Sequence, residues 1–88
     1  MDFRWNDDNL EHATKHGVTP EEAQSVVLYA SAPYPEYRGN DKWLVVGRGI
    51  GGRFIQVVYL IDFDGTFYVI HARPLTESER RRYRRRMK

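Results

Sequence analysis

The sequence predicts an α+β fold in which two N-terminal helices pack on an antiparallel β-meander and a basic helix follows at the C-terminus. Between Lys42 and Arg73, three runs rich in β-branched and aromatic residues are separated by Gly-Gly and Asp-Gly dipeptides. Helix-start patterns precede this segment, and an arginine-rich pattern follows it. With 88 residues, the chain has room for one domain, residues 1–88.

The two glycine-containing dipeptides tolerate the positive φ angles of two-residue hairpin turns. With two-residue turns, Arg48 pairs with Ile55, and Ile61 pairs with Tyr68, and this register sorts the side chains onto two faces. The face expected under the helices carries Leu44, Val46, Ile50, Ile55, Val57, Tyr59, Ile61, Tyr68, Ile70 and Ala72. The opposite face carries Trp43, Val45, Gly47, Gly49, Phe54, Gln56, Val58, Leu60, Phe67, Val69, His71 and Arg73.

The second face is therefore expected to bring Gln56, His71 and Arg73 together, away from the N-terminal helices. Gly47 and Gly49 predict a shallow depression opposite Gln56. Glycine in a strand also marks bulges, and a bulge would invert part of this register.

The N-terminal segment predicts a short edge strand followed by a helix. Phe3 and Trp5 alternate with polar residues, as in a half-buried strand. Either Asn6 or Asp7 can cap the helix, which runs through residue 15 or 16 and stops at Gly17.

A second helix has a specific start signal. Thr19 is the expected N-cap, Pro20 occupies the first turn and Glu22 is expected to close a capping box. Its apolar stripe consists of Ala23, Val26, Val27 and Ala30. Residues 31–40, with two prolines and a glycine, predict a loop or irregular edge strand.

The last helix is expected to begin at a capping box formed by Thr76 and Glu79 and to run to about Met87. Leu75, Tyr83 and Met87 form its inward-facing line. The other positions hold Arg80, Arg81, Arg82, Arg84, Arg85 and Arg86. Like charges at spacings of three and four repel, so a docked Tyr83 or a bound anion should help this helix form.

Composition restricts the possible partners and compartment. The chain has no cysteine, which excludes disulfides and thiolate metal sites and suits a reducing cytoplasm. Its start lacks a secretory pattern and no apolar run approaches membrane-span length, so we expect a soluble, cytoplasmic protein. Residues 1–44 hold four basic and eight acidic residues, whereas residues 45–88 hold ten basic and four acidic ones. Such a basic segment suits a polyanion or an acidic protein.

The order of these elements and several short sequences resembles the BrnT toxins. The matching pieces are Phe3, Trp5, Asn9-Leu10, Lys15-His16-Gly17-Val18, Glu22-Ala23, Gly52-Arg53, Val57-Val58-Tyr59, Ile70-His71-Ala72-Arg73, Glu79-Arg80 and Tyr83. The chain departs from the family pattern at His71, where many relatives have serine, and in the loop 31–41.

The resemblance implies a RelE-like fold and the ribonuclease half of a type II toxin–antitoxin pair. It further implies no cofactor and inhibition by a DNA-binding, BrnA-like antitoxin. Paired antitoxin segments are expected to bring two toxins together as a heterotetramer that reaches operator DNA only through the antitoxin.

Cleaving RNA without a metal requires a base for the 2′-hydroxyl, cations around the phosphorane and an acid for the leaving oxygen. Arg53 and Arg73 offer planar forks suited to phosphate, although Arg73 can instead pair structurally with Glu79. His16 and His71 are the candidates to give or take a proton, because they carry imidazole groups. His16 can also simply complement a helix C-terminus, and His71 can be a core histidine.

The remaining candidates carry equally plain alternatives. Lys15 can be an ordinary last-turn cation, and only the resemblance raises it to a catalytic candidate. Glu79 can be a base or can merely close its capping box. Tyr83 can stack on a nucleobase or anchor its helix. We expect His71, Arg81, Arg82, Tyr83 and Arg85 to bind the RNA substrate, with the exposed arginines on its phosphates.

Two functions are therefore expected. The resemblance implies the first, a metal-independent endoribonuclease toxin with RNA as its substrate. The alternative is a module that binds RNA or an acidic protein through the same sheet and arginine-rich helix without turnover.

Overall fold

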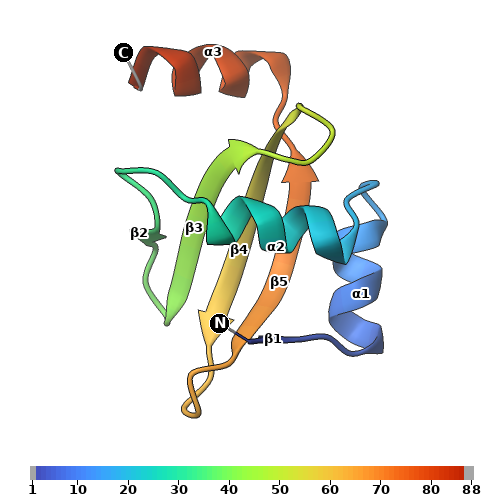
Figure 1. Ribbon diagram of the computed structural model, residues 1–88. Helices are drawn as coiled ribbons and strands as arrows, with labels where there is room; N and C mark the ends of the chain where they lie inside the picture. Colours follow the sequence, from blue (N-terminus) through green and yellow to red (C-terminus); the bar gives the residue numbers. More distant parts are fainter. Residues whose placement is uncertain (1, 87–88) are drawn as a thin grey trace.

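The computed structural model describes residues 2–86 and shows an α+β fold with three helices and one five-stranded mixed sheet (Figure 1). The elements in chain order are β1 (Phe3–Arg4), α1 (Asp7–Thr14), α2 (Pro20–Leu28), β2 (Glu36–Tyr37), β3 (Lys42–Arg48), β4 (Phe54–Ile61), β5 (Phe67–Pro74) and α3 (Glu77–Arg86). The strand order is β1-β5-β4-β3-β2. Strand β1 pairs in parallel with β5, whereas the other neighbours are antiparallel.

Helix α1 begins where the sequence predicts. Asn6 is the N-cap, and its side chain accepts a hydrogen bond from the Asn9 backbone N–H at 3.1 Å. The Asn9 side chain accepts in return from the Asn6 N–H at 2.6 Å, which completes a reciprocal cap. After the helix, Gly17 adopts φ +79°, a left-handed conformation that ends the helix.

Helix α2 begins with the predicted Thr19 cap and Pro20 in the first turn. The Thr19 hydroxyl accepts from the Glu22 N–H at 3.1 Å. The prediction that Glu22 closes a capping box with Thr19 is wrong, because the Glu22 carboxylate pairs with Arg53 instead.

The predicted two-residue turns are also wrong, since the loops comprise residues 49–53 and 62–66. In the first loop, the Gly49 N–H donates to the Arg53 carbonyl, and the Gly52 N–H donates to the Gly49 carbonyl. Arg48 consequently pairs with Phe54, one residue away from the predicted partner. The second loop has the same arrangement and brings Leu60, rather than Ile61, opposite Tyr68.

This one-residue shift inverts the faces predicted for β3. Val45 and Gly47 face α2, where a Cβ on Gly47 would lie 3.7 Å from Val26. Leu44 and Val46 lie on the open face. The predicted depression at the glycines is therefore filled by α2, because the missing side chains allow this helix to approach the sheet.

The faces of β4 and of the end of β5 are as predicted. Ile55, Val57 and Tyr59 are buried, and Gln56 pairs across the sheet with Arg73. A bulge between Val58 and Tyr59 shifts the first half of β5, so its predicted faces are exchanged: Phe67 and Val69 lie on the buried side.

The core lies between α2 and the sheet and includes Val18, Ala23, Val26, Val45, Ile55, Val57 and Val69. Helix α1 lies beside β5, and α3 lies across the end of the sheet (Figure 1). Tyr83 docks α3, with its ring centroid 5.1 Å from that of Phe54 and 6.2 Å from that of Tyr34. Met87, expected in the same inward line, lies outside the described residues.

The helices of residues 2–86 are too short or too polar for a membrane span.

Candidate nucleic-acid interface

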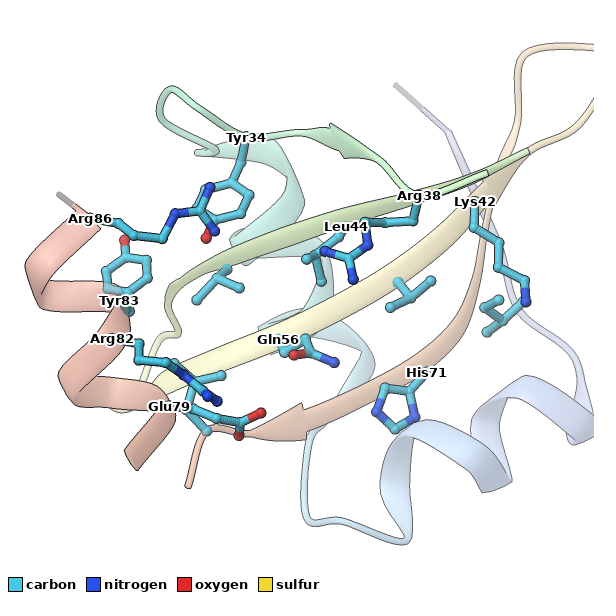
Figure 2. A pocket seen from close by; sticks show the side chains of 14 residues that line it. Tyr34, Arg38, Lys42, Leu44, Gln56, His71, Glu79, Arg82, Tyr83 and Arg86 are labelled. Carbon is cyan, nitrogen blue, oxygen red and sulfur yellow. The ribbon is translucent and has the colours of Figure 1, made fainter. Parts of the chain in front are cut away.

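A cavity of about 690 Å³ lies on the open face of the sheet, on the side away from α2 (Figure 2). Strands β3, β4 and β5 form its floor, and α3 and the segment around β2 form its walls. The apolar part of its lining consists of Leu44, Val46, Val58, Ile70 and Leu75. Gln56 is the polar residue at the centre of this floor.

Cationic side chains line the cavity around its apolar floor. They are Arg38 and Lys42 near β2, and Arg82 and Arg86 on α3. Four cations against the single carboxylate of the lining, that of Glu79, make the cavity electropositive.

The cations differ in how far the protein itself neutralises them. Glu36 accepts from Arg86 at 2.9 Å and from Arg38 at 3.0 Å, and these contacts, led by Arg86, lower the pKa of Glu36. Within residues 2–86, Arg82 and Lys42 have no acidic partner. These two cations are therefore the most available for an anionic ligand.

Glu79 and Arg73 form a bidentate pair at one end of the cavity. Both guanidinium nitrogens of Arg73 donate to the carboxylate at 2.7 Å. Glu79 also accepts from the Thr76 N–H at 2.9 Å, and the Thr76 hydroxyl accepts from the Glu79 N–H, as the capping box predicts. These contacts, led by Arg73, lower the pKa of Glu79 to about 2, which makes this carboxylate a weak base.

Two histidines meet beside β5. The ring centroids of His16, just after α1, and His71, on β5, are 5.8 Å apart. Burial lowers the pKa of His71 below its usual range, and the positive charges of Arg73, His16, Lys15 and His12 lower it further. His71 is therefore neutral at pH 7 and can accept a proton.

Arg53 does not join this group. It donates to the carboxylate of Glu22 at 2.9 Å and to the carbonyl of Gly17, and it does not line the cavity. The side chain of Glu22 is only 8% exposed, so Arg53 compensates a nearly buried charge.

The arginines of α3 divide between two faces of the helix. Arg82 points into the cavity together with Glu79, Tyr83 and Arg86 (Figure 2). Helical periodicity places Arg81 and Arg85 on the far side of α3, and neither lines the cavity.

The structure thus brings His71, Arg82, Tyr83 and Glu79 together around one cavity, and the His16 ring lies beside that of His71. Lys15 precedes His16, and its charge adds to the lowered pKa of His71. Sequence reasoning missed Tyr34, Arg38 and Lys42 as members of this site. These aromatic and basic residues recur at every fourth position, and this spacing was the sequence feature that could have grouped them. Tyr34 and Arg38 lie in the irregular segment before β3 and Lys42 begins that strand, so only the fold shows that the three side chains line one cavity.

Across residues 2–86, no cluster of three or more histidine, cysteine or carboxylate side chains is suited to hold a metal ion. Comparison of the chain with protein-family models, with curated proteins and with solved structures finds no match.

Proposed function

We propose that the protein is a metal-independent endoribonuclease toxin of the BrnT type, with a RelE-like arrangement, which cleaves RNA held in the cavity on its open sheet face. The observation that carries the proposal is a half-buried histidine, His71, on the floor of an electropositive cavity, with the ring centroid of His16 5.8 Å from its own. RNA cleavage needs this combination of a proton acceptor, a second titratable group and phosphate-binding cations.

In the proposed reaction, the neutral imidazole of His71 takes the proton of a ribose 2′-hydroxyl. The 2′-oxygen attacks the adjacent phosphorus, and the bond from phosphorus to the 5′-oxygen breaks. His16 or Lys15 donates a proton to that leaving oxygen. The products are a 2′,3′-cyclic phosphate and a 5′-hydroxyl end.

The cations supply binding and stabilise charge. Arg82 has no acidic partner within residues 2–86, so its planar guanidinium group is available to bind the phosphate. It would stabilise the negative charge that increases on the phosphate oxygens in the transition state. Arg73 serves mainly to hold Glu79 and α3 in place. Tyr83 and the apolar floor offer surfaces on which bases can stack.

The pairing of Arg73 with Glu79 favours a second candidate function. Both groups are candidates for chemistry, yet each neutralises the other. A module that binds RNA without turnover would use the same cavity and would need neither group free.

The proposed partner is a cognate DNA-binding antitoxin that covers the cavity. An acidic, amphipathic segment would match both its apolar floor and its cations. As a heterotetramer with two toxins, this partner would connect the toxin to operator DNA.

Cleavage and binding assays on one set of RNAs separate the two candidates. We expect the wild type to cleave single-stranded RNA into products with cyclic phosphate ends, with EDTA present. His71→Asn should lower the rate by about 10²-fold or more while RNA affinity changes less than about threefold. His12→Asn is the matched control, because His12 is exposed, its imidazole contacts the Asp8 carbonyl, and it is the smallest of the named contributions to the lowered pKa of His71.

Wild-type protein that binds RNA and leaves it intact would support the binding module. Equal cleavage by the wild type and His71→Asn would remove His71 from the chemistry.

A further inference from the structure

Gln56 is a polar side chain among the aliphatic residues of the cavity floor. It lies at the middle of the open face, with Val46 opposite it on β3 and Arg73 opposite it on β5. Val46 and the nearby Leu44 are almost fully buried. An aliphatic residue at position 56 would continue this surface, so the amide calls for a separate explanation.

The amide of Gln56 has no hydrogen-bond partner within residues 2–86. Because those residues contain no buried side-chain nitrogen or oxygen without a partner, the amide must face the open cavity. Figure 2 shows it directed into the space between Arg82 and His71. It can therefore donate and accept one hydrogen bond each toward a ligand.

The charges around the cavity indicate which part of a nucleotide would meet this amide. Lys42 and Arg38 stand at one end of the cavity, and Arg82 stands at the other (Figure 2). Phosphates are attracted to these ends, whereas the aliphatic floor between them suits the flat, weakly polar surface of a base. A base on this floor would present its edge to Gln56.

We propose that Gln56 is a specificity-determining residue that reads an adenine in single-stranded RNA, an inference that rests on the proposed function. The side-chain carbonyl of Gln56 accepts from the N6 amino group, and its NH₂ donates to the adjacent ring nitrogen. This bidentate pairing is the usual match between glutamine and adenine. Unpaired bases in single strands expose the edges on which it forms.

The test uses oligouridine strands with 2′-O-methyl riboses and one central residue, which is adenine, guanine or purine lacking the N6 amino group. The methyl groups prevent attack by the 2′-oxygen, so fluorescence anisotropy reports binding without cleavage. We expect the wild type to bind the adenine strand about tenfold more tightly than the purine strand. Gln56→Leu should bind both strands equally.

Gln24→Leu is the matched control, because the only other glutamine of the chain contacts Trp5 and does not line the cavity. It should keep the adenine preference. Circular dichroism establishes that each variant folds.

Equal binding of all strands by the wild type would overturn the inference, as would an adenine preference that survives in Gln56→Leu. A guanine preference that Arg82→Ala abolishes would show that Arg82 reads the base, and would also overturn it. An adenine preference without cleavage of unmodified RNA would refute the ribonuclease and leave the role of Gln56 intact. Failure of the wild type to bind any strand would also overturn the inference, whereas cleavage of unmodified RNA decides the ribonuclease separately.

Discussion

Arg73 donates two hydrogen bonds of 2.7 Å to the carboxylate of Glu79, and this ion pair joins the end of β5 to the first turn of α3. The helix carries many like charges and little apolar surface. The pair therefore works with Tyr83 to hold α3 against the sheet.

We predict that Glu79→Gln lowers the free energy of unfolding by about 1 kcal/mol at pH 7, the scale of a partly exposed ion pair. The pKa of Glu79 falls from 4.5 to about 2 on folding, so the pair stabilises the protein above about pH 4.5. This contribution is lost as the pH falls toward 2. Urea unfolding at pH 7 and at low pH measures both values.

Glu77→Gln is the control for that measurement. It removes a carboxylate from the same turn of α3, and Glu77 forms no ion pair within residues 2–86. A loss of stability as large for Glu77→Gln as for Glu79→Gln would show that the helix dipole, not the pair, is responsible.

A second prediction concerns Gly49, which lies against the almost buried side chain of Glu22. A Cβ at position 49 would stand 2.7 Å from Cγ of Glu22, and Arg53 holds that side chain in place. Gly49→Ala should therefore destabilise the protein by about 1–2 kcal/mol through overpacking and loss of the ion pair. Thermal and urea unfolding measure the change.

Gly51→Ala tests whether this cost is local. Its added Cβ would meet nothing closer than a Glu22 oxygen at 4.0 Å, and its φ is not positive. We expect a change within about 0.5 kcal/mol. Similar destabilisation by both substitutions would mean that the loop conformation, not Glu22, sets the cost.

A third prediction compares adjacent arginines of α3. Arg82 lines the cavity, whereas Arg81 lies on the far side of the helix. Arg82→Ala should weaken binding of single-stranded RNA severalfold and reduce the slope of affinity against salt by about 0.7, the value of one phosphate contact. Arg81→Ala should leave the slope nearly unchanged.

Anisotropy titrations over a range of salt concentrations give both slopes. Equal slopes for the two variants would place the RNA along the outer surface of α3, outside the cavity.

A fourth prediction concerns the proton affinity of His71. Burial is the main cause of its lowered pKa, and neighbouring positive charges, including Lys15, add to it. Lys15→Gln removes one of these charges, so the protonated imidazole becomes less unfavourable and the pKa of His71 should rise. NMR titration of the imidazole signals measures it.

Lys42→Gln provides a cation of the same type that lines the cavity but does not contribute to the shift. It should leave the pKa of His71 unchanged. An equal rise of the His71 pKa in both variants would show that the overall electrostatic potential of the cavity, not the charge of Lys15 in particular, lowers this pKa.

Interactions within a few residues of each other were predictable without the fold. Helix ends depend on such interactions, because side chains and glycines close in the chain satisfy backbone groups that lack a partner within the helix. The examples are the Thr19 cap, the stop at Gly17 and the reciprocal cap of Thr76 and Glu79. Alternation along β4 likewise predicted that the side chain of Gln56 lies on one face of the sheet and those of the buried Ile55 and Val57 lie on the other.

The strand register could not be predicted in this way. The same Gly51-Gly52 dipeptide fits a two-residue turn or a longer loop with one left-handed glycine, and only Gly52 has a positive φ here. Since side chains alternate with a period of two, this one-residue difference moved Leu44 and Val46 to the open face.

The sequence by itself determined the kinds of elements, their caps and the basic character of the last helix, because these depend on neighbours in the chain. Only the tertiary structure decided which distant groups meet. In the fold, Arg53 pairs with the carboxylate of Glu22, and Lys42, Gln56 and Arg82 line one cavity. Such contacts join segments tens of residues apart, so loop lengths, a bulge and packing determine them together.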